Sequence, residues 1–192
     1  MIDLITPQSI IANLRAGSKK QALQELAKKA AELTGQHERA IFDVLLERER
    51  LGTTGVGHGI AIPHGKLSNL EHVYGVFARL ERPVDFDAID DQPVDLMFLL
   101  LAPEGAGADH LKALARIARL LRDVDVAKKL RASRDAQAIY SVLALPPARA
   151  STYAYVNPVI AVLLGWAFGG EAVTGRVVLA ASAVVDGFDP AD

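Results

Sequence analysis

The run Val94 to Leu101, VDLMFLLL, constrains the fold of this chain most, because all but one of its residues are apolar. A strand with one face in water alternates apolar and polar residues, whereas a strand covered on both faces is apolar almost throughout. Val73 to Leu80, VYGVFARL, predicts a second strand. We therefore predict an α/β fold, with a mixed β-sheet flanked by helices on both faces.

Five stretches predict those helices. The first begins after Ser18, which has capping-box spacing to Gln21, and ends before Gly35. Apolar residues recur along it at helical intervals: Ala22, Leu23, Leu26, Ala27, Ala30 and Leu33. The other four are predicted from Glu38 to Arg48, after Asp109 as N-cap, from Val124 to Arg131 and from Arg134 to Leu143.

Two segments read as loops by composition, Thr53 to Gly57 and Ala102 to Ala108. The second, APEGAGA, is glycine-rich and is expected to be a flexible linker. It lacks the Gly-Lys-Ser/Thr ending of a P-loop, so it does not predict a nucleotide site.

Residues Gly59 to Lys66, GIAIPHGK, present His64 between Pro63 and Gly65. We expect a short strand that ends at Pro63, because proline has no amide hydrogen to give to a ladder. His64 then stands at the strand end, and Gly65 leaves room for an incoming group beside the imidazole. A neutral imidazole offers one ring nitrogen as a nucleophile, so phosphoryl transfer is one interpretation. A structural loop histidine is the other.

The stretch Glu47 to Leu67 resembles the active-site region of type-2 enzyme IIA domains of the bacterial phosphotransferase system. The opening MIDLITPQSIIANL is similar to the nitrogen-regulatory branch of that family. The resemblance covers residues 1–147 and implies a type-2 enzyme IIA fold. It also implies that His64 accepts the phosphoryl group, that His110 is the second active-site histidine, and that Arg48 supplies a positive contact.

Without that resemblance, two of these residues have ordinary explanations. Arg48 lies near the carboxyl end of its predicted helix, where the dipole favours any cation. His110 falls in the first turn of its helix, where a surface or capping histidine is common. The same position places it beside free backbone amides that favour a phosphate.

Composition excludes several other classes of function. The formal net charge of -2 does not indicate a nucleic-acid-binding protein. The chain has no cysteine, and His37, His58 and His72 have no zinc-site spacing, so we expect neither a metal nor another cofactor. A nucleophile elbow is absent from the sequence, so a hydrolase has no support. The amino terminus does not read as a signal peptide, and we expect the chain in the cytoplasm.

Residues 148–192 predict something different, an apolar helical tail. Ala150 to Gly170 carries no charge and is long enough to span a bilayer, which takes about 20 residues. With Val177 to Val185 it resembles the last helix pair of EamA-type drug/metabolite transporters. Two helices cannot form a transport pathway. A membrane anchor through residues 150–186, helices packed on the domain, and a fusion remnant stay open.

The leading hypothesis is a phosphocarrier with a phosphohistidine intermediate, which receives its phosphoryl group from an HPr-like donor protein. The resemblance favours a regulatory member that signals through phosphorylation-dependent binding of target proteins. The alternatives are a sugar-specific enzyme IIA that passes phosphate to a IIB domain, and a membrane-anchored interaction module without phosphotransfer. The regulatory targets, the phosphorylated nitrogen and the oligomeric state stay open.

Overall fold

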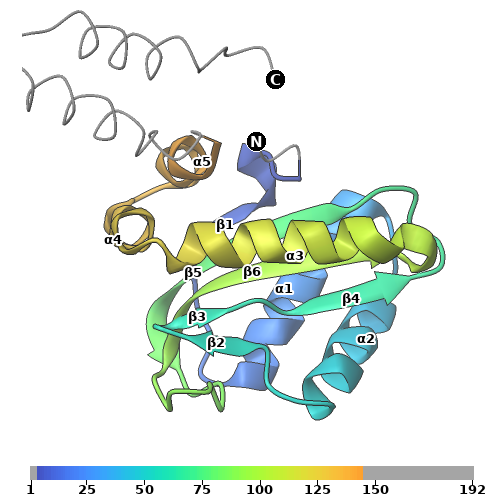
Figure 1. Cartoon of the computed structure of the whole chain (residues 1–192), viewed down its shortest axis with the longest axis horizontal. Helices are drawn as coiled ribbons and strands as arrows, with labels where there is room; N and C mark the ends of the chain where they lie inside the picture. The colour runs from blue at the N-terminus through green and yellow to red at the C-terminus, as the bar shows by residue number, and fades with distance from the viewer. Residues whose placement is uncertain (1–3, 145–192) are drawn as a thin grey trace, which may run out of the picture. The chain divides into compact units, whose positions relative to one another are not determined.

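A computed structural model describes residues 4–144 of the chain (Figure 1). A six-stranded mixed sheet has the order β1-β5-β6-β3-β2, with β4 also paired to β6. The strands are β1 (Ile10–Leu14), β2 (Gly55–Gly57), β3 (Ile60–Ala61), β4 (His64–Leu67), β5 (Tyr74–Val84) and β6 (Val94–Pro103). The predicted tail, residues 148–192, and the domain boundary after residue 147 lie outside the described residues.

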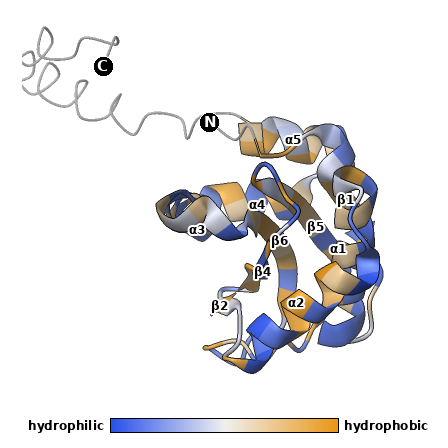
Figure 2. Cartoon of the chain, turned by 90° about the vertical axis from the view of Figure 1, so that its right-hand side faces the viewer, coloured by the Kyte–Doolittle hydropathy of each residue, from blue (hydrophilic) through white to orange (hydrophobic). Residues whose placement is uncertain are grey.

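Helices cover both faces of this sheet, as predicted from the apolar run. They are α1 (Lys19–Thr34), α2 (Glu38–Arg50), α3 (Gly107–Arg122), α4 (Val124–Ala132) and α5 (Ala136–Ala144), with the 3-10 turns η1 (Pro7–Ser9) and η2 (Glu104–Ala106). Figure 2 shows α3 on one side of the strands and α1 and α2 on the other. The mixed sheet flanked by helices is therefore confirmed.

The central strand β6 explains why its sequence is apolar almost throughout. It pairs with β5 along one edge, and with β3 and then β4 along the other. Its side chains alternate between two core clusters. Met97, Leu99 and Leu101 pack in the cluster formed with α1 and α2, and Leu96, Phe98 and Leu100 in the cluster formed with α3, α4 and α5. All six are 0% exposed.

The first helix begins and ends where the sequence predicts. The Ser18 side chain accepts a hydrogen bond from the amide of Gln21, and Gly35 closes the helix with a left-handed φ of 69°. In a capping box the Gln21 side chain would accept from the amide of Ser18. Here it accepts instead from the amide of Gly17, at 2.8 Å. These two hydrogen bonds fix the start of α1.

Several boundaries differ from the sequence predictions. The stretch from Ala102 to Ala108 is not a flexible linker, because β6 continues to Pro103 and η2 leads directly into α3. The expected loop from Thr53 to Gly57 contains β2, which pairs with β3. Strand β1, for which periodicity makes no prediction, is parallel to β5. Its residues, IIANL, do not alternate between apolar and polar, so pairing to the sheet determines this strand.

Candidate functional site

His64 lies at an interruption in the sheet edge. Strand β3 ends at Ala61, before Pro63, as predicted from the missing amide hydrogen. The expectation that the ladder stops there is wrong, since the Pro63 carbonyl accepts from the Leu100 amide at 2.9 Å and His64 begins β4, paired with Leu100. A proline can lack a donor and still accept, so pairing resumes at once. His64 thus begins β4 directly after a two-residue break, Ile62 and Pro63, that separates it from β3.

The hydrogen bonds of the His64 ring determine its tautomer. Nδ1 lies 2.9 Å from the carbonyl oxygen of Ile62. A carbonyl only accepts, so Nδ1 carries the proton and donates it. Nε2 is left with its lone pair, which accepts a hydrogen bond from Nε of Arg48 at 2.9 Å. The nucleophilic nitrogen of this imidazole is therefore Nε2.

Arg48 comes from the last turn of α2, close to the predicted helix end. Its Nε donates to His64, and one of its terminal nitrogens donates to the carbonyl of Gly52 at 3.0 Å. The guanidinium fork thus holds two fixed acceptors at once, which a lysine could not do in the same geometry. Sequence reasoning missed the Gly52 and Ile62 carbonyls, because any residue type supplies a backbone acceptor.

His110 joins the same site from α3. Its ring centroid lies 5.6 Å from that of His64, and the planes are inclined by 56°. The residue is 6% exposed, and its Nε2 is buried without a hydrogen-bond partner among the described residues. Asp109 is not the N-cap, because α3 already begins at Gly107 without a capping side chain. His110 is consequently the fourth residue of the helix, still close to its free amides.

Burial is the main cause that lowers the pKa of both histidines below the usual value. For His64 the Ile62 carbonyl opposes that effect, while the nearby Arg48 charge adds to it. For His110 the neighbouring His64 and Lys66 add to the effect of burial. Both rings are therefore neutral at pH 7, which keeps Nε2 of His64 available as a nucleophile.

Gly65 does not clear space for an incoming group, contrary to expectation. It is buried, and a Cβ placed on it would lie 2.5 Å from Cγ1 of Val44. The absent side chain lets α2 pack closely against β4, which brings Arg48 to His64. The glycine serves the packing of a helix and not the access of a partner.

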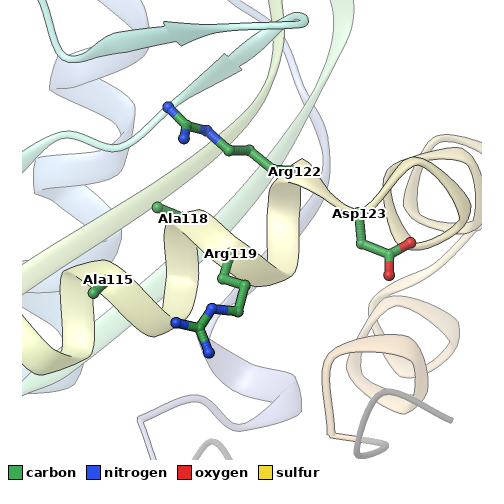
Figure 3. Close-up of a pocket in the computed structure, with 5 residues that line it drawn as sticks. All are labelled: Ala115, Ala118, Arg119, Arg122 and Asp123. Atoms are coloured by element: carbon green, nitrogen blue, oxygen red, sulfur yellow. The ribbon is translucent and has the colours of Figure 1, made fainter. Parts of the chain in front are cut away.

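Elsewhere on the surface, a shallow hollow on α3 is lined by Ala115, Ala118, Arg119, Arg122 and Asp123 (Figure 3). It includes none of the three predicted site residues. Within residues 4–144, no three histidine or carboxylate side chains converge as a metal site. Over the same range, no helix has the length and apolar character needed to cross a bilayer.

Fold and site together define an α/β domain with a deprotonated histidine nitrogen beside an arginine and a second histidine. The chain belongs to the family described as "Phosphoenolpyruvate-dependent sugar phosphotransferase system, EIIA 2", which matches residues 3–145.

The similar proteins carry two kinds of name. A "Nitrogen regulatory protein" from Bradyrhizobium diazoefficiens is 76% identical over 78% of this chain and 97% of its own length. A "PTS system fructose-specific EIIA component" from Haloferax volcanii is 39% identical over 74% of this chain and 94% of its own. The crystal structure of Nitrogen Regulatory Protein IIA-Ntr from Neisseria meningitidis is 33% identical, with a TM-score of 0.70, covering 73% of this chain and 97% of that one.

Proposed function

We propose that this chain is a phosphocarrier of the nitrogen-related phosphotransferase system and that His64 carries its phosphoryl group. Membership of the enzyme IIA family and the high identity to a nitrogen regulatory protein support the assignment. The observation that assigns the phosphoryl group to this residue is its unprotonated Nε2, whose lone pair faces Arg48 while Ile62 holds the proton on Nδ1.

The transfer breaks one phosphorus–nitrogen bond and forms another. Nε2 of His64 attacks the phosphorus of a phosphohistidine on an HPr-like donor, and the donor imidazole leaves with the electron pair of the broken bond. The Nδ1 proton stays in place, so the phosphorylated ring gains positive charge. The Ile62 carbonyl accepts from that N–H and stabilises the charge.

Arg48 and His110 act on the phosphoryl oxygens. In the resting site Arg48 Nε donates to the Nε2 lone pair, so it must turn away as phosphorus approaches. Its donors are then free for the oxygens, with charge-assisted hydrogen bonds. His110, whose buried Nε2 has no other partner in the described region, lies beside the same position and donates there as the Nε2–H tautomer.

Members of this family receive phosphate from HPr-like proteins and pass it to partners such as IIB. For this chain we favour a regulatory output in the cytoplasm, through target proteins that distinguish the free and phosphorylated forms. The phosphoryl oxygens carry up to about 2 negative charges, and the positive charge of the ring offsets one of them, so His64 becomes net negative on phosphorylation. Transfer to a IIB domain is the second candidate, because a fructose-specific component is also a relative.

Labelled phosphoenolpyruvate with a reconstituted donor system tests the acceptor. Wild-type chain should acquire an acid-labile, base-stable phosphate, and His64→Ala should acquire none. His72→Ala is the matched control, since His72 is an exposed histidine on the same domain and should leave labelling unchanged. Label retained by His64→Ala would refute the assignment.

Two assays separate the outputs. Pull-downs with wild type, His64→Ala and His64→Asp should retain different proteins if partner choice depends on charge at this position. The rate at which a IIB domain removes the phosphoryl group from the phosphorylated chain tests the second candidate function, transfer to IIB. Fast discharge together with identical pull-downs would favour sugar transport over regulation.

A further inference from the structure

A buried carboxylate lies next to Arg48 in the chain, at the end of α2. The Glu49 side chain is 7% exposed. Its two oxygens accept from the amide of Thr54 at 3.0 and 3.1 Å, and one of them accepts from the Thr54 hydroxyl at 2.6 Å. The ammonium of Lys19, from α1, lies 2.8 Å from the other oxygen. We call these three residues the Glu49 clasp.

The clasp closes the turn that orients Arg48. Residues 51–53 connect α2 to Thr54, and the Gly52 carbonyl in that turn accepts from Arg48 at 3.0 Å. The bonds from Glu49 to Thr54 join the two ends of this turn. If the turn opened, the Gly52 carbonyl would move and Arg48 would keep only its contact with His64.

Helix energetics alone do not account for an acidic residue here. Glu49 is the last but one residue of α2, where the helix dipole disfavours negative charge. Burying a carboxylate adds a further cost unless donors surround it. Thr54 and Lys19 offset both effects by interacting with the carboxylate. Thr54 is 4% exposed, and Lys19 also donates to the Phe86 carbonyl at 3.0 Å.

We propose that Glu49 is a positioning residue for phosphoryl transfer, which acts with Thr54 and Lys19 to hold the turn that aims Arg48 at Nε2 of His64. Its effect on the rate rests on the proposed function of His64. Its effect on the geometry does not.

Thr54→Val is the main test, because valine matches threonine in shape and removes only the hydroxyl donor. Thr54→Ser restores that donor and serves as the rescue. Glu49→Ala removes the whole clasp. Glu47→Ala is the matched control, since Glu47 is an exposed carboxylate in the same helix end and has the same charge change.

Transfer from the phosphorylated donor should slow roughly 10- to 100-fold in Glu49→Ala and by a smaller factor in Thr54→Val, as expected for a misplaced catalytic contact. Thr54→Ser and Glu47→Ala should stay close to wild type. Circular dichroism should show native secondary structure for each variant under the assay conditions.

The pKa of His64, measured by NMR, separates positioning from a merely structural role. The Arg48 charge lowers that pKa, and the Glu49 charge raises it by a smaller effect. If Arg48 swings away, the pKa rises toward its usual value in both Thr54→Val and Glu49→Ala. If Arg48 stays in place, the pKa is unchanged in Thr54→Val and falls in Glu49→Ala, and this result would overturn the proposal.

The rate assay and the NMR titration test different hypotheses, so their results distinguish a wrong function from a wrong positioning role. A wild-type chain that takes no phosphate on His64 would remove the proposed function, while the titration would still report on Arg48. Wild-type rates in both Glu49→Ala and Thr54→Val, with His64 labelled normally, would remove the positioning role alone.

Discussion

Replacing Gly65 by alanine tests the close packing of α2 on the strand that carries His64. The new Cβ would lie 2.5 Å from Cγ1 of Val44, whereas carbon atoms pack at about 3.5–4.0 Å. The φ angle of Gly65 is not positive, so the contact and not backbone strain decides the outcome. Valine has essentially one χ1 rotamer in a helix, so its methyl group cannot turn aside. The helix must move away from β4.

The size of the effect follows from that overlap. Overpacking by one methyl group costs about 1–3 kcal/mol, and we expect about 2 kcal/mol for Gly65→Ala. Val44→Ala alone should cost about 1 kcal/mol, because Val44 is only partly buried. In the double variant the clash disappears, so it should be more stable than Gly65→Ala, with a coupling of about 1–2 kcal/mol.

Urea unfolding of the full chain, followed by circular dichroism, measures these differences. Circular dichroism is preferred because the single tryptophan, Trp166, lies outside the described residues. Arg48 is four residues after Val44 and faces the same way, so a displaced α2 should also slow phosphoryl transfer to His64. Strictly additive stability changes, or a double variant less stable than Gly65→Ala, would refute the packing argument.

Three further predictions follow from the contacts of the site and its supporting helices. Arg48→Lys keeps the charge but cannot donate to both His64 and Gly52, so the rate of phosphoryl transfer should fall roughly 10-fold. The urea unfolding midpoint should be nearly unchanged, and an unchanged transfer rate would contradict this account of the geometry. Because the pKa values of His64 and His110 are lowered by folding, the unfolded chain binds more protons below about pH 6.5, and the free energy of unfolding should fall as the pH drops from there through the folded-state pKa values. Urea midpoints measured across this range should fall less in His64→Gln, and a parallel fall would contradict the assignment. Asp123→Ala removes the side chain that caps α4 at the amides of Asp125 and Val126, and should cost about 1 kcal/mol of unfolding free energy without slowing transfer.

In the proposed transfer, the resting site pairs the attacking nitrogen with the group that would stabilise the phosphorylated product. Arg48 Nε donates to the Nε2 lone pair that would attack phosphorus, so this donor already has an acceptor before phosphorylation. The neutral state of His64, maintained by burial, makes this possible, since two positive groups would repel each other. In the proposed mechanism, rotation of the guanidinium would convert this resting contact into one with the phosphoryl oxygens.

The sequence alone determined the architecture and the candidate residues. Strand β6 has apolar side chains on both of its faces, and such a strand needs packed helices on both sides of the sheet to bury them. The first and last residues of α1 could also be predicted, because Ser18 caps its start and Gly35 ends it through local hydrogen bonds and backbone conformation. His110 and Arg48 could be named only through the family resemblance, because each has an ordinary explanation in the sequence itself, whereas His64 is also marked by the Pro-His-Gly setting.

Tertiary structure decided what those residues can do. Whether Gly65 opens the site or admits a helix depends on Val44, which is distant in sequence, and the motif contains no trace of that contact. The unprotonated state of Nε2 follows from the Ile62 carbonyl beside Nδ1, and a backbone acceptor leaves no residue type in the sequence by which to identify it. Local signals in a sequence report the types of neighbouring residues, while hydrogen-bond geometry and packing distances depend on how the backbone and distant segments are placed in three dimensions.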